Sequence, residues 1–290
     1  MNTTSALLLL LSISLSAGRN ILSKGISDVR FGSRPYFLIQ AVTFAVGAIL
    51  LFSLNPGAFE GLSKTTVTYA VIYAVLMICA QWCYLLALGS GMVSICATMY
   101  SMGFIIPTVA GMIAWEEPVT PKKIIGILVI IPVIILSGLK KDDSRKKNTG
   151  FLFLIPMIAA MLSSGTMGII QKLLQTSEHP EQTPAFVIIA FLIATATSLV
   201  GALISKKQAL PDIKKRLAFS TGIGLCFASC NLINTYLTGM IESSIFFPTL
   251  NISMIVLTMI LGIVFFKERL EARKIAILAL GSASILLITL

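Results

Sequence analysis

The stretch Phe246–Ile288 reads FFPTLNISMIVLTMILGIVFFKERLEARKIAILALGSASILLI and decides the fold. Two apolar runs in it flank a short charged segment at 267–274. Each run is close to the ~20 apolar residues that a helix needs to cross a bilayer. Because so short a connection can only turn the chain straight back, the stretch predicts an antiparallel pair of membrane-spanning helices.

Nearly the same phrase occurs earlier, at Ile95–Leu136, as ICATMYSMGFIIPTVAGMIAWEEPVTPKKIIGILVIIPVIIL. When Glu117 is set against Glu268, Lys122–Lys123–Ile124 falls on Arg273–Lys274–Ile275 without a gap. Each copy of the phrase closes a group of five apolar segments. A phrase used twice in this way indicates an internal repeat, and membrane carriers are commonly built from such repeats.

The repeated phrase resembles the EamA-type carriers of the drug/metabolite transporter superfamily. In these carriers each half ends in a helix with a midway proline, followed by a glutamate, a basic turn and a final helix. Pro107 fills the proline position of the first half, whereas the second half has Thr258 there and carries Pro248 earlier. The resemblance covers nearly the whole chain and implies a membrane transporter, but it names no substrate.

Ten apolar runs can be counted, with approximate limits 4–23, 33–53, 66–88, 91–114, 121–139, 149–171, 184–205, 217–238, 243–265 and 272–290. Thr120 and Pro121 suit the N-cap and the first position of the fifth helix. The longest polar break, at 140–148, separates a predicted first repeat at 4–139 from a second repeat at 149–290. Since five helices is an odd number, the second repeat must be inverted. We therefore expect an all-α polytopic membrane protein of ten transmembrane helices.

The composition is incompatible with a soluble domain. Apolar residues make up 56% of the chain, charged residues only 12%, and the mean hydropathy is +0.94. A soluble domain is about one quarter charged. The net charge of +10 comes from Lys and Arg between the apolar runs, so the bilayer rather than nucleic acid is the expected partner.

Few groups could support catalysis or hold a metal or cofactor. The single histidine, His179, lies in a polar stretch, and the five cysteines lie within apolar runs, where a thiol acts as a small hydrophobe. No nucleotide-binding loop of the form G-x-x-x-x-G-K-[ST] occurs. We therefore expect no cofactor, no ATP-driven motor and no enzyme.

The loop charges predict the orientation. If the N-terminus is outside, the cytoplasmic connections contain 17 Lys and Arg residues and the opposite side contains 4. Positive charge collects on the cytoplasmic side, so both termini are predicted to lie outside. Related carriers usually keep both termini in the cytoplasm. The expected location is a bacterial cytoplasmic membrane.

Two charged residues have competing interpretations. Arg19 lies one turn before the end of the first apolar run. The sequence favours snorkelling of its head group to the interface, and the alternative is an anchor for an anionic substrate group. Glu117 and Glu268 match the family motif, but each precedes a helix, where a carboxylate favours the positive end of the helix dipole. We expect both to be structural.

Amide and aromatic side chains are the predicted substrate-binding residues. Tyr100 and Asn251 occupy equivalent positions in the two copies of the phrase, each about 12–14 Å into its predicted helix and so near the membrane midplane. Gln81 and Asn231 match each other when Gly89 is set on Gly239. The complete predicted set is Tyr100, Asn251, Gln81, Trp82, Asn231 and Asn234. Hydrogen bonding between helices is the competing interpretation for each.

These observations predict a secondary transporter that moves a small metabolite, such as an amino acid or an amine, by alternating access between the two halves. A flippase-like subunit for a lipid-linked sugar is the closest alternative. An integral membrane enzyme, and a receptor or scaffold, are alternatives of other classes. Association of identical copies stays open.

Overall fold

The computed structural model describes residues 2–23, 26, 29, 32–90, 100–138, 151–206, 212–266 and 272–289. This part of the chain forms ten α-helices. They are α1 (Thr3–Ser23), α2 (Arg34–Leu54), α3 (Lys64–Ser90), α5 (Ile105–Ala114), α6 (Pro121–Gly138), α7 (Phe151–Gln175), α8 (Thr183–Ile204), α9 (Ile213–Met240), α10 (Ser243–Phe266) and α11 (Ala272–Thr289). Two short 3₁₀ helices, η2 (Met102–Phe104) and η3 (Pro180–Gln182), precede α5 and α8. Nine of these helices match predicted apolar runs to within a few residues, and α5 matches the end of the fourth run, 91–114, of which residues 91–99 lie outside the described part of the chain.

Six of the described helical segments are long and apolar enough to cross a bilayer, and three shorter ones are also apolar. The protein is therefore an integral multi-pass membrane protein. The basic connection at 140–148, the charged segment at 267–271 and Glu268 lie outside the described residues.

Side-chain hydroxyl groups cap the starts of two helices, and one of these caps was predicted from the sequence. The Thr120 hydroxyl accepts the backbone N–H of Lys123 at 3.3 Å, and Pro121 begins α6, so the predicted cap is confirmed. Ser33 caps α2 in the same way, accepting the N–H of Tyr36 at 3.4 Å. Such caps satisfy N–H groups that the first helical turn leaves without partners.

The helices form two compact units, which are described separately. The first unit comprises Met1–Val75 and Leu173–Gly239, and the second comprises Leu76–Lys172 and Met240–Leu290. Each unit takes helices from both halves of the sequence. The predicted repeat boundaries are a property of the sequence and do not coincide with these units.

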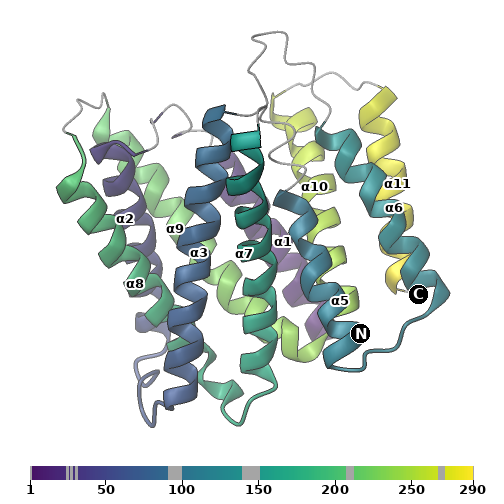
Figure 1. Cartoon of the computed structure of the whole chain (residues 1–290), viewed down its shortest axis with the longest axis horizontal. Coiled ribbons are helices and arrows are strands. Elements are labelled where there is room, and N and C mark those ends of the chain that lie inside the picture. The colour runs from purple at the N-terminus through teal and green to yellow at the C-terminus, as the bar shows by residue number, and fades with distance from the viewer. Residues whose placement is uncertain are drawn as a thin grey trace. The chain divides into compact units, whose positions relative to one another are not determined.

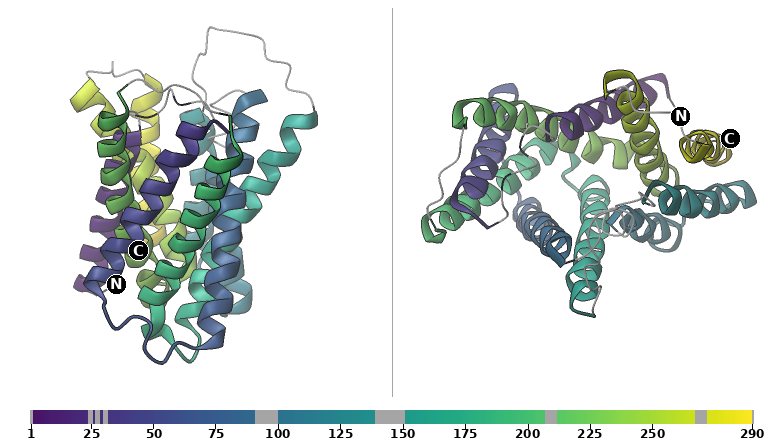
Figure 2. Two further views of the ribbon diagram at one scale, coloured as in Figure 1. Left: turned by 90° about the vertical axis from the view of Figure 1, so that its left-hand side faces the viewer. Right: turned by 90° about the horizontal axis from the view of Figure 1, so that it is seen from above.

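In the first unit, α2 packs along α8 (Figures 1 and 2). Their contact is close because Gly47 lies under the ring of Phe191; an added Cβ there would be 2.7 Å from that ring. Phe191 in turn packs at 5.6 Å from Phe44 and at 5.4 Å from Phe227, measured between ring centroids. Glycine and aromatic side chains thus join α2, α8 and α9 into one core.

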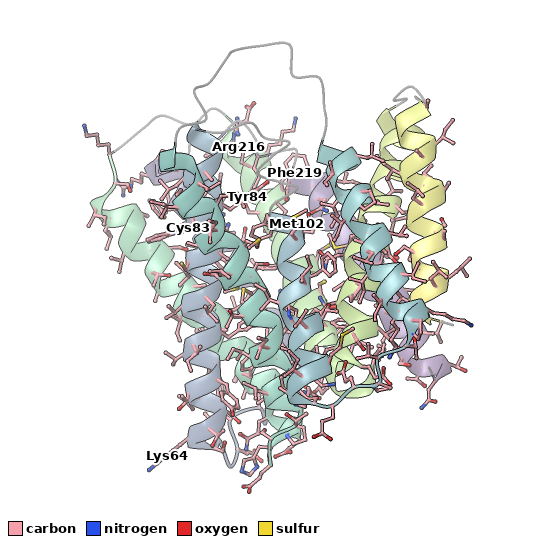
Figure 3. All side chains as sticks on the ribbon, turned by 45° about the vertical axis from the view of Figure 1, so that its right-hand side comes forward. Lys64, Cys83, Tyr84, Met102, Arg216 and Phe219 are labelled. Atoms are coloured by element: carbon pink, nitrogen blue, oxygen red, sulfur yellow. The ribbon has the colours of Figure 1, made fainter. Side chains whose placement is uncertain are left out.

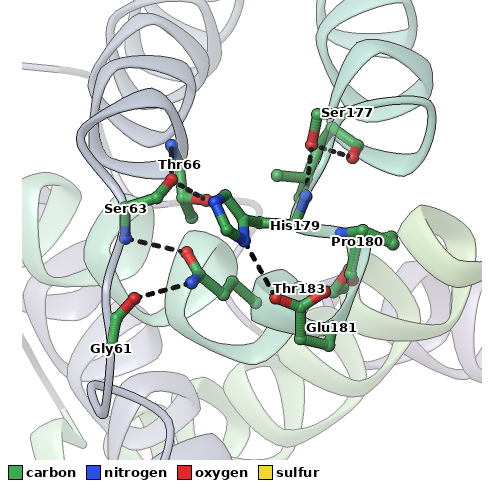
Figure 4. Close-up of polar contacts among 10 residues, drawn as sticks. Gly61, Ser63, Thr66, Ser177, His179, Pro180, Glu181 and Thr183 are labelled. Carbon is green, nitrogen blue, oxygen red and sulfur yellow. Dashed lines mark hydrogen bonds and ion pairs between the residues drawn. The ribbon is translucent and has the colours of Figure 1, made fainter.

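At one end of the first unit, the buried side chain of Gln182 joins two connections (Figure 4). Its amide oxygen accepts the N–H of Ser63 at 3.0 Å, and its amide nitrogen donates to the carbonyl of Gly61 at 2.9 Å. The side-chain amide of Gln182 therefore makes two hydrogen bonds to the backbone of the α2–α3 connection, one as acceptor and one as donor. This fixes that connection against the start of α8.

In the second unit, α6 packs along α11, and α10 packs against both α5 and α11. The Ser284 hydroxyl donates to the carbonyl of Gly126 at 2.8 Å across the α6–α11 contact. The backbones of η2 and α7 also approach closely, because a Cβ added to Gly165 would be 2.6 Å from the carbonyl oxygen of Gly103. Small residues let helix backbones approach in membranes, where packing rather than hydrophobicity drives association.

Candidate functional site

A polar seam runs between α1 and α9 in the first unit. The Ser12 hydroxyl donates to the side-chain oxygen of Asn234 at 2.5 Å, and the Ser16 hydroxyl contacts the Cys230 sulfur at 2.8 Å. Asn234 also donates to that sulfur at 3.4 Å. The contacts progress in opposite directions along the two helices, so α1 and α9 are antiparallel here. We call Ser12, Ser16, Cys230 and Asn234 the α1–α9 seam.

The predicted residue Asn231 lies beside this seam and is buried. Its side-chain oxygen accepts the hydroxyl of Tyr73 on α3 at 2.5 Å, and its amide nitrogen donates to the carbonyl of Phe227 at 2.8 Å. Tyr73 is itself fully buried and packs on Phe186. Asn231 is therefore part of a satisfied hydrogen-bond pair that links α3 to α9.

The predicted residue Tyr100 lies in the second unit against Tyr84 of α3. The two ring centroids are 4.9 Å apart, and both rings pack on a small buried cluster that contains Met157 of α7. Figure 3 labels Tyr84 on α3. On the same stretch of α3, Gln81 is partly buried and Trp82 is 39% exposed. Gln81 and Trp82 thus lie on the same stretch of α3 as Tyr84, and Tyr100 packs against that stretch.

The predicted residue Asn251 lies within α10, and its amide nitrogen donates to the carbonyl of Phe247 at 2.9 Å. No described residue donates to its side-chain oxygen, and no described hydrogen bond joins it to Tyr100. Tyr100, Asn251, Gln81 and Trp82 belong to the second unit, whereas Asn231 and Asn234 belong to the first.

A cluster of two ion pairs lies at the α5–α6 connection, and the sequence analysis did not predict these pairs. The carboxylate of Glu117 accepts the backbone N–H groups of Ser243 and Ser244 at 2.6 and 2.8 Å. It also lies 3.4 Å from the Lys172 ammonium at the end of α7. Glu117 therefore caps α10, and the expectation that it serves the following helix, α6, is corrected. Thr120 caps α6, which leaves Glu117 free to reach the N-terminus of another helix.

The same connection holds a second ion pair. Lys123 of α6 pairs with Glu242 and donates to the carbonyl of Pro118 at 2.9 Å. We call Glu117, Lys172, Lys123 and Glu242, with the start of α10, the charged clasp. Gly111 is needed beneath it, because an added Cβ would be 2.6 Å from a Glu117 carboxylate oxygen.

The environment of Glu117 favours its ionised form. Burial raises the pKa of this carboxyl, but the N–H groups of Ser244 and Ser243, the Ser244 hydroxyl and the Lys172 charge outweigh burial, and the net pKa is lowered. Hydrogen bonds to a carboxylate stabilise its charged form. At neutral pH the clasp is thus a fixed structural charge rather than a proton donor.

Arg19 lies in the first unit on α1, near the α1–α9 seam. Its guanidinium carbon is 4.7 Å from the ring centroid of Phe227. Sequence reasoning noted Arg19 but missed Phe227, Ser12, Ser16 and Tyr73. The spacing of Ser12, Ser16 and Arg19, which places them on one face of a helix, was the available signal.

Comparison with known proteins agrees with the helical arrangement. A solved structure described as "Crystal structure of protein" superposes with a TM-score of 0.77 over 100% of this chain and 97% of its own, at 14% sequence identity. That likeness shows the fold alone. No curated protein matches the sequence. Residues 151–290 match the EamA-like transporter family, which confirms the resemblance found in the repeated phrase. The second half of the chain is therefore similar to the EamA-like transporter family.

Proposed function

We propose that the protein is a secondary transporter that moves a small metabolite, such as an amino acid or an amine, by alternating access. The observation that carries this proposal is the family match of residues 151–290, together with the repetition of their central phrase at Ile95–Leu136. Two inverted copies of one unit can exchange conformations, so that a midplane site opens to each side in turn.

Polar side chains at matched positions of the two halves form the proposed substrate site. Tyr100 and Asn251 are its central pair, and Gln81, Trp82, Asn231 and Asn234 complete it. Support comes from the cost of leaving a polar group without a partner in hydrocarbon. The side-chain oxygen of Asn251, for which no described residue is a donor, keeps hydrogen-bonding capacity that a substrate could use.

The proposed orientation places both termini outside the cytoplasm, because the 17 basic residues then face inward. A reporter that is active only in the cytoplasm should be silent after Leu290 and active when inserted at Ser144. The reverse pattern would contradict the proposed orientation and leave the proposal of transport intact.

Transport is tested with the purified protein in proteoliposomes. We expect saturable uptake of at least one small metabolite from a panel of amino acids, amines, sugars and nucleosides. Uptake of none of them, combined with translocation of a fluorescent lipid-linked sugar, would favour the flippase alternative. Hydrolysis or group transfer without flux would indicate an enzyme.

The central pair is tested in the same assay. Tyr100→Phe and Asn251→Leu should each lower uptake several-fold, because each removes a hydrogen-bonding group from the proposed site. Tyr236→Phe on α9 is the matched control and should keep wild-type uptake. If both site variants are folded and transport normally, Tyr100 and Asn251 are packing residues and the substrate binds elsewhere.

A further inference from the structure

Arg19 is a cation held against an aromatic cluster. Its guanidinium stacks over Phe227, and the Phe227 ring packs on Phe191 and Phe44, with centroid distances of 5.4 and 6.1 Å. Phe191 and Phe44 are buried. The head group of Arg19 therefore lies on the rings that join α2, α8 and α9 inside the first unit.

These rings lie at mid-depth of their helices. Phe227 is about 14 residues, or ~21 Å, from the first residue of α9, Ile213. Phe191 is about 13 residues, or ~20 Å, from the last residue of α8, Ile204. Half of a hydrocarbon core is only ~15 Å thick. The Arg19 guanidinium thus packs on rings in the middle third of α8 and α9, while its own backbone lies four residues before Ser23, the last residue of α1.

No carboxylate of the described first unit compensates this charge. Its acidic residues are all in connections or at a helix end, namely Glu60, Glu178, Glu181 and Asp212. None of the ion pairs among the described residues includes Arg19. The ring face of Phe227 offsets part of the cost of a cation at this depth, but an intramembrane arginine without a carboxylate is typical of a functional site.

The neighbours of Arg19 can bind the rest of a small polar molecule. Ser16 and Ser12 lie three and seven residues before it on the same face of α1. Both serines bond to Cys230, at 2.8 and 3.3 Å, and sulfur is a weak acceptor that a better hydrogen-bonding group can replace. Asn234 adds an amide at the far end of the seam. A cation followed by hydroxyl and amide groups matches a molecule with an anionic group and a polar body.

We propose that the Arg19 guanidinium binds the carboxylate of the substrate, so that the protein recognises small carboxylate-bearing metabolites and discriminates against the corresponding amines. This inference rests on the proposed transport function. The planar guanidinium donates two parallel N–H bonds to a carboxylate, which a single ammonium cannot do. The anionic group of a lipid phosphate has related chemistry, so the experiment must separate a soluble carboxylate from a lipid.

The test uses the full-length protein in phosphatidylcholine vesicles, with the common L-amino acids and the amines formed by their decarboxylation as matched probes. Thermal unfolding of the protein with each probe measures binding, and uptake measures transport. At least one acid should raise the unfolding temperature of the wild type, whereas its amine should not. Stabilisation by no acid, or equally by an acid and its amine, would contradict the proposal.

Three variants locate the effect at Arg19. Arg19→Gln should weaken the binding of the stabilising acid at least tenfold, and Arg19→Lys should give an intermediate loss, because it keeps the charge but not the paired donors. Lys214→Gln removes one positive charge from an exposed position of α9 and should bind as the wild type does. If Arg19→Gln does not fold, Arg19→Lys decides, since wild-type affinity and selectivity in that variant would refute the need for a guanidinium.

The outcomes separate this inference from the proposed function. Acid binding that depends on Arg19 but leads to no uptake supports the carboxylate site and refutes transport. Saturable uptake that Arg19→Gln leaves unchanged supports transport and refutes the site. If vesicles with added phosphatidylglycerol stabilise the wild type but not Arg19→Gln, and no acid does so, the bound anion is a lipid phosphate and the proposal fails.

Discussion

The α1–α9 seam and the charged clasp both bring polar side chains together, but they handle charge in opposite ways. In the clasp, Lys172 and Lys123 each pair with a glutamate, and Glu117 also receives two backbone N–H groups. Beside the seam, the Arg19 guanidinium lies on the ring face of Phe227, and no ion pair among the described residues includes it. A cluster whose charges are mutually satisfied stabilises the fold, whereas a charge without an opposite partner keeps its capacity for a ligand.

The largest expected effect on stability is at the clasp. Glu117→Gln should lower the free energy of unfolding by about 3 kcal/mol, because it leaves the buried Lys172 ammonium without its carboxylate. Thermal or denaturant unfolding in detergent would measure the loss. The exposed neighbour Glu116→Gln is the matched control and should have little effect. Equal stability of both variants would show that the clasp contributes no more than a surface ion pair.

A smaller effect is expected beside the seam. Tyr73→Phe should cost about 1–2 kcal/mol, because the buried side-chain oxygen of Asn231 loses the phenol that donates to it. Tyr69→Phe, one turn earlier on α3, is the control and should be nearly neutral. The same unfolding measurement applies. A loss at Tyr73 as large as that at Glu117 would remove the contrast between a neutral pair and a charged clasp.

The third prediction concerns the pH dependence of the clasp. Since the pKa of Glu117 is lowered in the folded state, its contribution to stability is fully present above the ordinary glutamate value of ~4.3 and is lost as the pH falls through its folded pKa. The unfolding temperatures of wild type and Glu117→Gln should therefore converge below about pH 4. A constant difference down to pH 3 would show that the carboxylate charge is not what the clasp requires.

Much of the fold was predictable because hydrophobic length and helix caps are local properties. Nine of the ten apolar runs match described helices to within a few residues, the fourth run matches α5 at its end, and Thr120 caps α6 as expected. The role of Glu117 was only half predictable. Its sequence neighbours suggested a helix dipole, but the helix that it caps begins at Ser243, more than a hundred residues later. Packing between distant segments decides such a contact, and a single sequence does not encode it locally.

The sequence predicted which types of residue would form the candidate site, but it did not predict which residues they contact. Asn234 and Asn231 were chosen as polar groups at membrane depth, yet their bonds to Ser12 and Tyr73 come from other helices. The sequence marked Arg19 as unusual, but it did not show that the Arg19 guanidinium packs on the ring of Phe227 in α9. Register between helices is set by side-chain fit over many residues, so it becomes visible only in the folded chain.

The close approach of Gly103 and Gly165 has a consequence for how this chain can evolve. A methyl group added to Gly165 would overlap the carbonyl oxygen of Gly103, and one added to Gly103 would lie 2.9 Å from the carbonyl of Met161. A backbone atom cannot rotate aside as a side chain can. Even alanine, the smallest step away from glycine, would force η2 and α7 apart. Mutational drift at these two positions should therefore be confined to glycine for as long as descendants of this protein keep the crossing.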